Sequence, residues 1–218
     1  MRPRIQIAVA VAATMLATAA CVATAQVGTD PVPDLMLSTA WFPSYLPQAP
    51  VLLVVPDGTG PSFEEARLIN GQTVNRKITL WALDGGGFPI PNMPYAAWSL
   101  RWQDGGVAAC ENGLAATFNT RANGSTDWIA PPHAGGHSQS LVRVYWQASQ
   151  PLLSNTGMLL SVNSPDINGD LSVDIADVAD FAADYFGAYA FRSDLAFDGA
   201  VNLTDISVLV SKMGRSCP

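Results

Sequence analysis

The pattern of apolar and polar positions divides the chain into two regions with different periods. From about residue 30 to residue 162, short apolar runs and alternating stretches are separated by glycine- and proline-rich turns. Residues 51–55 and 141–146 form compact runs, and residues 74–83 alternate over part of their length. Six or seven short strands at this spacing predict an antiparallel β-sandwich.

Two local signals add detail to this region. Asn123-Gly124 stands between the stretches Thr117–Thr120 and Thr126–Trp128, and this dipeptide favours the positive φ angles of a tight hairpin. Phe63–Leu68 fits a single helical turn. The pattern contains no long helical period before residue 163.

After Ser164-Pro165 the apolar period changes to that of a helix. Apolar residues recur at helical offsets over residues 175–186 and again over residues 203–213, and each stretch ends at a glycine, Gly187 or Gly214. An offset of 28 residues aligns the two stretches. Each unit is too small to bury its own apolar face, so we expect the two helices to pack against each other. Hardly any linker separates them from the preceding strand.

A twelve-residue window precedes each predicted helix and carries oxygen-bearing side chains at alternate positions. Over residues 166–177 they stand at positions 1, 3, 5, 7, 9 and 12, and residues 194–205 repeat most of this pattern. This is the spacing of an EF-hand-type calcium loop. The duplication predicts a calcium-binding module over residues 163–218. The alternative is that the same side chains cap two helices without a metal.

Two calcium loops that each precede one helix, without the entering helix of a full EF-hand, resemble a type I dockerin. Asp166, Asn168, Asp170 and Asp177 match the dockerin pattern. The resemblance implies two Ca²⁺ ions, with weaker binding at the second loop because Ala196 removes one oxygen. The implied ligands are side-chain oxygens and, at Ser172 and Ala200, backbone carbonyls: Asp166, Asn168, Asp170, Ser172, Asp174, Asp177, Asp194, Asp198, Ala200, Asn202 and Asp205.

The module departs from the dockerin pattern at two kinds of position. Leu171 replaces the usual glycine at position 6, where the loop bends sharply, so we expect some backbone strain there. Dockerins dock onto cohesin domains largely through positions 10 and 11, which here hold Ile175-Ala176 and Leu203-Thr204 instead of Ser-Thr. The module therefore binds a different cohesin or folds onto the β region. An exposed Ile175 favours an apolar docking patch, and a buried one favours the second alternative.

The β region carries a second resemblance. Pro56–Gly60, Ile78–Asp84 and the following Pro89-Ile-Pro91 resemble turn and strand motifs of an invasin-type bacterial immunoglobulin-like domain. The expected fold class is therefore mainly β with a small α module. An immunoglobulin-like antiparallel β-sandwich over residues 26–162 is followed by a two-helix, calcium-loop, dockerin-like domain over residues 163–218.

The N-terminus predicts a secreted protein. Arg2 and Arg4 precede an apolar run over residues 5–20, and the small residues Ala23 and Ala25 complete a signal peptide over residues 1–25. The alternative is a lipid anchor on Cys21. The expected location is extracellular or at the cell surface, and no integral membrane span follows. Cys110 and Cys217 remain after cleavage, and the sequence leaves open whether they pair.

Charge excludes one class of partner. The net charge is −7, and nucleic acid binding needs clustered Lys and Arg, so nucleic acid is not an expected partner. Residues 165–218 hold nine of the eighteen acidic groups and three basic ones. Such repulsion destabilises a compact fold unless a cation neutralises it.

Three functions remain open for the β region. It is an adhesive or spacer module in a non-catalytic protein, an accessory part of a polysaccharide-degrading glycoside hydrolase system, or a carbohydrate-binding module. No facing pair of carboxylates is evident, so the sequence favours a non-enzyme and leaves catalysis undecided. Trp98 and Trp102 share one strand face and are the candidate sugar platform. His133 and His137 with Cys110 fit a metal chelate, or are incidental loop histidines.

Overall fold

The part of the chain that the computed structural model describes, residues 31–218, is mainly β with two short α-helices. The predicted signal peptide and the Cys21 alternative lie outside the described residues. The strands are β1 (Thr39–Trp41), β2 (Val51–Leu53), β3 (Ala66–Arg67), β4 (Thr73–Val74), β5 (Ile78–Trp81), β6 (Trp98–Trp102), β7 (Val107–Ala109), β8 (Ser125–Trp128), β9 (Ala134–Gly136), β10 (Leu141–Trp146), β11 (Gln150–Pro151), β12 (Met158–Leu159) and β13 (Ser161–Asn163). The helices are α1 (Ile175–Tyr185) and α2 (Leu203–Ser211), with 3₁₀ turns η1 (Phe63–Glu65), η2 (Tyr95–Ala97) and η3 (Phe191–Ser193).

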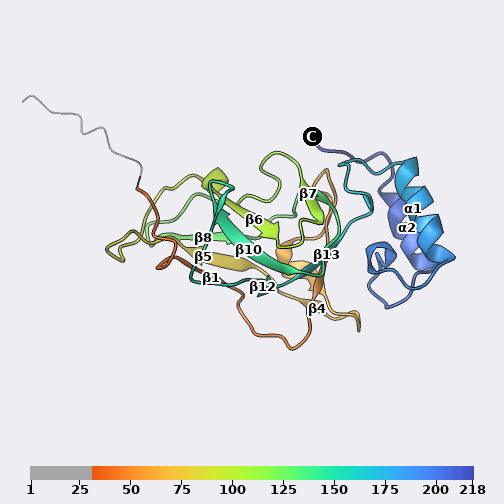
Figure 1. Cartoon of the computed structure of the whole chain (residues 1–218), viewed down its shortest axis with the longest axis horizontal. Helices are drawn as coiled ribbons and strands as arrows, with labels where there is room; N and C mark the ends of the chain where they lie inside the picture. The colour runs from red at the N-terminus through yellow and green to blue at the C-terminus, as the bar shows by residue number, and fades with distance from the viewer. Residues whose placement is uncertain (1–30) are drawn as a thin grey trace, which may run out of the picture. The chain divides into compact units, whose positions relative to one another are not determined.

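The strands form four small sheets. Their orders are β1-β5-β8, β11-β10-β12 with β6 also paired to β10, β13-β2-β3-β4, and β7-β9. Figure 1 shows β6 and β10 side by side, and five cross-strand pairs join them. All of these strand pairs are antiparallel except β2 with β13, which run parallel. This pair differs from the all-antiparallel expectation because the chain passes through β3–β12 before β13, so no hairpin dictates the direction.

The main hydrophobic core lies between these sheets and contains Trp98 and Trp102, which the sequence predicts as a sugar-binding platform. Both lie on one face of β6, as their alternation predicts, but that face also carries Leu100 and points into the core. Trp98 is 0 % exposed and Trp102 is 4 % exposed. The Trp102 indole nitrogen donates a hydrogen bond of 2.6 Å to the Leu160 carbonyl. Neither ring can stack on a ligand, so this candidate sugar platform is wrong.

The predicted hairpin at Asn123-Gly124 forms with a different geometry. The Gly124 amide donates to the Arg121 carbonyl, so Ala122 and Asn123 are the central residues of the turn, and Gly124 follows them with a positive φ of 75°. The second strand is β8, whereas Thr117–Thr120 is not a regular strand. Backbone bonds from the Thr117 amide to the Asp127 carbonyl and from the Arg121 amide to the Ser125 carbonyl join the two segments, and between them the Thr126 hydroxyl donates to the Phe118 carbonyl.

The two α-helices begin and end close to where the apolar period predicts. Figure 1 shows α1 and α2 beside each other. Between them and their loops lies a second hydrophobic cluster, formed by Ile167, Val173, Phe181, Leu195 and Leu209. Neither helix has the length and apolar character that crossing a bilayer requires.

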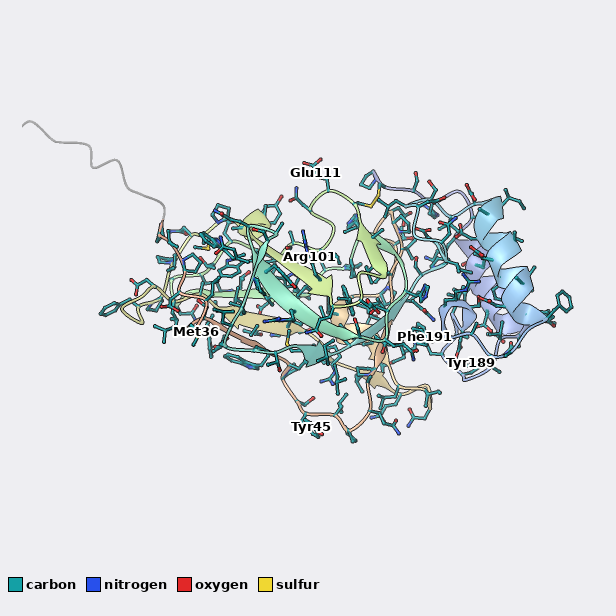
Figure 2. All side chains as sticks on the ribbon, viewed as in Figure 1. Met36, Tyr45, Arg101, Glu111, Tyr189 and Phe191 are labelled. Carbon is teal, nitrogen blue, oxygen red and sulfur yellow. A yellow bond between two sulfur atoms is a disulfide. The ribbon has the colours of Figure 1, made fainter. Side chains whose placement is uncertain are left out.

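Covalent and polar contacts join the C-terminal segment to the β region. Cys110 and Cys217 form a disulfide, seen as a sulfur–sulfur bond in Figure 2. Arg215 forms an ion pair of 3.2 Å with Asp57. The buried Asn163 amide donates a hydrogen bond of 2.9 Å to the Asp194 carbonyl. The helices therefore do not swing on a linker.

Candidate metal centre

The two acidic loops have the same backbone geometry. Positions 4 and 6 adopt positive φ in both copies: 75° at Gly169 and 71° at Leu171 in the first loop, and 59° at Phe197 and 83° at Gly199 in the second. Leu171 therefore has the left-handed conformation expected of it. Each loop has one glycine and one bulky residue at these two positions. The strain of a left-handed side chain costs of the order of 1 kcal/mol in each copy.

Position 1 of each loop is a buried carboxylate that the loop backbone surrounds. Asp166 accepts hydrogen bonds from the Gly169, Asp170 and Leu171 amides at 2.8–3.1 Å. Asp194 accepts equivalent bonds from Asp198 at 3.1 Å and from Gly199 at 3.0 Å. The amides hold each carboxylate inside the loop, where a carboxylate ligand of a cation has to lie.

Position 12 ties each loop to the helix that follows it. Asp177 accepts bonds from the Ile167 amide at 2.7 Å and the Asp174 amide at 2.8 Å. Asp205 accepts bonds of 2.8 Å from Ala196 and from Asn202. One carboxylate thus joins the start of the loop to the N-cap of the helix.

Position 9 supplies the N-cap itself. The Asp174 carboxylate accepts a hydrogen bond of 2.7 Å from the Ala176 amide, and the Asn202 side chain accepts one of 2.7 Å from Thr204. Capping boxes are complete in both helices. The capping part of the alternative interpretation is therefore confirmed at positions 9 and 12, and capping does not use every lone pair of these side-chain oxygens.

Four of these carboxylates are buried without a cationic partner among the described residues. Asp166, Asp177 and Asp205 are 0 % exposed and Asp194 is 2 % exposed. The three basic residues of the segment are engaged elsewhere: Arg192 pairs with Asp180 and Asp184, Arg215 pairs with Asp57, and Lys212 donates to the Thr59 carbonyl. Buried unpaired carboxylates are costly, and a bound metal ion is one of the few ways to offset that cost.

The pKa values also indicate that the ionised form of these carboxylates is unfavourable without a cation. Burial, followed by repulsion from Asp177 and Asp170, raises the pKa of Asp166 to about 6. Burial also raises the pKa of Asp177 and that of Asp205. A raised pKa means that the ionised carboxylate lowers the stability of the fold once the pH exceeds that pKa. A divalent cation would reverse this effect, because it favours the ionised form.

The loops differ in how closely their ligands converge. Asp194, Asp198 and Asp205 offer oxygens that all lie within 4.8 Å of one another, and among residues 31–218 no other group of three acidic, histidine or cysteine side chains does so. The ligand count favours the first loop, whereas the geometry brings the acidic groups of the second loop closer together. In the first loop, part of the oxygen set comes from Asn168, whose amide donates to Asp170 at 3.2 Å.

The remaining predicted ligands lie around the rim of each loop. Asn168, Asp170, Asp174, Asp198 and Ala200 are exposed, and Ser172 and Asn202 are half-buried. The amides of Ser172 and Ala200 make matching 3.0 Å bonds to the position-5 carboxylates Asp170 and Asp198. The donor set is all oxygen, which is the chemistry that Ca²⁺ prefers.

Tyr189 takes part in the second loop although no sequence pattern marks it. Its hydroxyl donates a hydrogen bond of 3.0 Å to the Asp194 carboxylate. Burial, followed by this bond and the nearby carboxylates, raises the pKa of Tyr189 to about 12, so the hydroxyl keeps its proton. Figure 2 shows Tyr189 and Phe191 on the segment just before the loop. Aligning the two loops at their offset of 28 residues does not identify Tyr189, because Tyr189 lies outside both twelve-residue windows.

Gly135 in β9 is a second residue that the sequence does not mark. A methyl group at this position would overlap a carboxylate oxygen of Asp166. The neighbouring Gly136 amide donates a hydrogen bond of 2.8 Å to the Asp166 carbonyl. The β region therefore forms part of the wall of the first loop.

Gly135→Ala is expected to displace the Asp166 carboxylate and to weaken calcium binding at the first loop by about tenfold or more, while the second loop keeps its affinity. Calorimetric titration of the full chain with calcium would resolve the two sites. Gly85→Ala is a suitable control, because nothing lies within 4 Å of a methyl group at that position and its φ, like that of Gly135, is not positive. Equal calcium affinities in Gly135→Ala and the wild type would show that β9 does not support the loop.

The two helices also present an unpaired apolar face. Ile175 and Leu203, the first residues of α1 and α2, are 74 % and 69 % exposed. Beside Leu203 a groove of about 230 Å³ runs between the helices. It is lined by apolar and aromatic residues, namely Val178, Phe181, Ala182, Tyr185, Phe186, Leu203, Ile206, Leu209 and Val210. The fold does not bury this face within the described chain.

The histidine-based metal chelate does not form. Cys110 is bonded to Cys217 and so has no free thiolate. Among the described residues, no cluster of three potential ligands contains His133 or His137. These histidines belong to the loop and strand around β9, as the alternative interpretation predicts.

No family model matches the chain, and no curated protein matches it at a significant level.

Proposed function

We propose that this chain is a secreted, non-catalytic modular protein whose C-terminal dockerin-like module binds Ca²⁺ and attaches to a cohesin-type protein domain. The β region, residues 26–162, is then an immunoglobulin-like spacer or adhesive module. In this proposal the attachment links the protein to polysaccharide catabolism outside the cell.

The observation that carries this proposal is the exposure of Ile175 and Leu203. They stand at the same position of the two loop–helix units, and both leave most of their apolar surface in solvent. Large exposed apolar side chains at equivalent positions of a repeat favour a docking surface over a folding requirement, because the second hydrophobic cluster is complete without them.

Bound calcium would order this surface by fixing the N-termini of α1 and α2. The residues immediately before Ile175 and Leu203 are Asp174 and Asn202, which cap the helices and are also the predicted ligands at position 9. A cation bound in the loop would therefore fix the direction in which each exposed side chain points. A partner protein would meet a surface that is ordered before binding, which lowers the entropic cost of association.

The contacts that hold the module to the β region leave this surface free. They include bonds made by Cys217, Arg215, Lys212, Asn163 and Asp166, and none of these residues lines the groove between the helices. This supports docking to a separate protein over folding of the helix face onto the β region.

Ile175→Asp and Leu203→Asp are each expected to weaken cohesin binding by about tenfold or more, because an interface must then desolvate a carboxylate. The measurement is biolayer interferometry of the full chain against a panel of cohesin domains, with calcium and with a chelator. Phe88→Asp is the matched control, since Phe88 is an exposed apolar residue of the β region, 69 % accessible. Absence of binding to every cohesin type in calcium would refute the docking proposal.

A further inference from the structure

The outward face of the β1-β5-β8 sheet carries a pattern of aromatic and hydrogen-bonding side chains that the fold does not explain. The strand register places Trp41, Thr79 and Asp127 in one row across the three strands. The inward residues of the same strands, such as Ile78 and Leu80, supply the core and are 0 % exposed. In the outward row Trp41 is exposed and Thr79 is half-buried, whereas Asp127 is buried, so Trp41 and Thr79 are the members that a ligand can reach.

Two tryptophans dominate this face. Trp41 is 36 % exposed and Trp81 is 39 % exposed, and their ring centroids are 4.4 Å apart. Trp81 occupies the next row, beside Thr39 and Ser125. Tryptophan is the side chain with the largest apolar surface. Exposing two neighbouring indole rings to water is unfavourable unless a ligand covers them.

Polar groups stand directly beside the tryptophan pair. The Thr79 hydroxyl donates a hydrogen bond of 2.7 Å to Asp127, and Arg121 forms an ion pair of 2.7 Å with the other carboxylate oxygen. The Arg121 side chain is 45 % exposed and also donates to the Ser125 hydroxyl at 3.3 Å. A guanidinium has five N–H donors, so Arg121 retains donors for a ligand.

The charge of this face selects among ligands. Asp127 and Arg121 neutralise each other, so the named groups carry no net charge. Because the charge of Arg121 is already paired with Asp127, a charged ligand gains little electrostatic attraction here, whereas a neutral ligand rich in hydroxyl groups can use the remaining Arg121 donors and the Thr79 hydroxyl. The apolar ring faces add the other requirement, because the C–H-bearing face of a pyranose ring is apolar and its edge is polar.

We propose that the β1-β5-β8 face binds a neutral pyranose oligosaccharide, with Trp41 and Trp81 contacting sugar ring faces and Arg121 and Thr79 hydrogen-bonding to hydroxyl groups. The two indole planes meet at 66°. Rings at this angle form a bent surface, which fits a single soluble chain and does not fit the flat face of a crystalline polysaccharide. This site replaces the buried Trp98 and Trp102 as the place for sugar recognition.

The site is independent of the calcium loops and of the exposed helix face, because it shares no residue with either. Sugar binding at this face can therefore be tested independently of cohesin attachment. Sugar binding is expected to persist in a chelator and in Ile175→Asp.

The test is calorimetric titration of the full chain with four soluble hexasaccharides, namely cellohexaose, xylohexaose, mannohexaose and maltohexaose. At least one is expected to bind, with an affinity that does not fall when the salt concentration is raised, since the contacts are not between net charges. Trp41→Ala and Trp81→Ala are each expected to weaken that binding by about tenfold or more.

Controls separate ligand contact from folding. Tyr45→Ala removes an aromatic side chain that projects from the loop between β1 and β2 and is 88 % exposed (Figure 2), and it is expected to leave binding unchanged. Trp81→Phe keeps a smaller aromatic face and is expected to retain intermediate affinity with wild-type unfolding temperature. Failure of all four sugars to bind, or equal binding by the tryptophan-to-alanine variants and the wild type, would overturn the proposal.

Discussion

Asp205→Asn is expected to remove most of the stabilisation that calcium gives to this chain at the second loop. A ligand present at about 100 times its dissociation constant stabilises a fold by about 2.7 kcal/mol. Asp205 is fully buried and joins the loop to α2, and with Asp194 and Asp198 it completes the acidic cluster of that loop. An amide in its place supplies one neutral oxygen where the carboxylate supplies two charged ones, so the site should lose its affinity at ordinary calcium concentrations.

The measurement is thermal unfolding of the wild type and the variant, each in calcium and in a chelator. The wild type should unfold at a markedly higher temperature in calcium, and Asp205→Asn should show only the part of this shift that the first loop supplies. Glu111→Gln is the control for the loss of one acidic group, because Glu111 is exposed on the loop after β7 (Figure 2). An unchanged calcium-dependent shift in Asp205→Asn would mean that the second loop is not a metal site.

Loss of the Cys110–Cys217 disulfide is expected to destabilise the chain by about 2–4 kcal/mol. The two residues are 107 positions apart, so the bond closes a long loop and restricts the unfolded chain strongly. It also holds the end of the chain, where the Cys217 amide donates to the Leu171 carbonyl in the first loop at 3.3 Å. The double variant Cys110→Ser/Cys217→Ser should therefore lose stability and also bind calcium more weakly at the first loop.

Urea unfolding of the wild type, the double variant and the reduced wild type would measure this effect. The reduced wild type should have the same free energy of unfolding as the double variant, because both lack the disulfide. Since the reduced wild type keeps its cysteine side chains, this agreement would show that the substitutions themselves have little effect. A double variant as stable as the oxidised wild type would show that the bond contributes nothing to folding.

Local patterns predict much of this structure. The helical period over residues 175–186 and 203–213 predicts α1 and α2 to within two or three residues, because the N-caps Asp174 and Asn202 and the glycines that follow the helices mark both ends. The glycine usual at position 6 of such loops also predicts backbone strain at Leu171, which has a φ of 71°. These features depend on residues close together in sequence.

The features that the sequence does not predict depend on contacts between segments that are far apart along the chain. Alternation places Trp98 and Trp102 on one face of a strand, but only the packing of β6 against β10 decides that this face is the core. The parallel pairing of β13 with β2 and the contact of Gly135 with Asp166 likewise join segments without any local signal. Trp41 and Trp81 come together only because β1 pairs with β5.

The central claim is that the two loops hold calcium, and calorimetric titration of the metal-free full chain with CaCl₂ tests it most directly. We predict two bound ions per chain, with Asp177→Asn abolishing one binding event and Asp205→Asn abolishing the other. No heat of calcium binding by the folded wild-type chain would contradict the account.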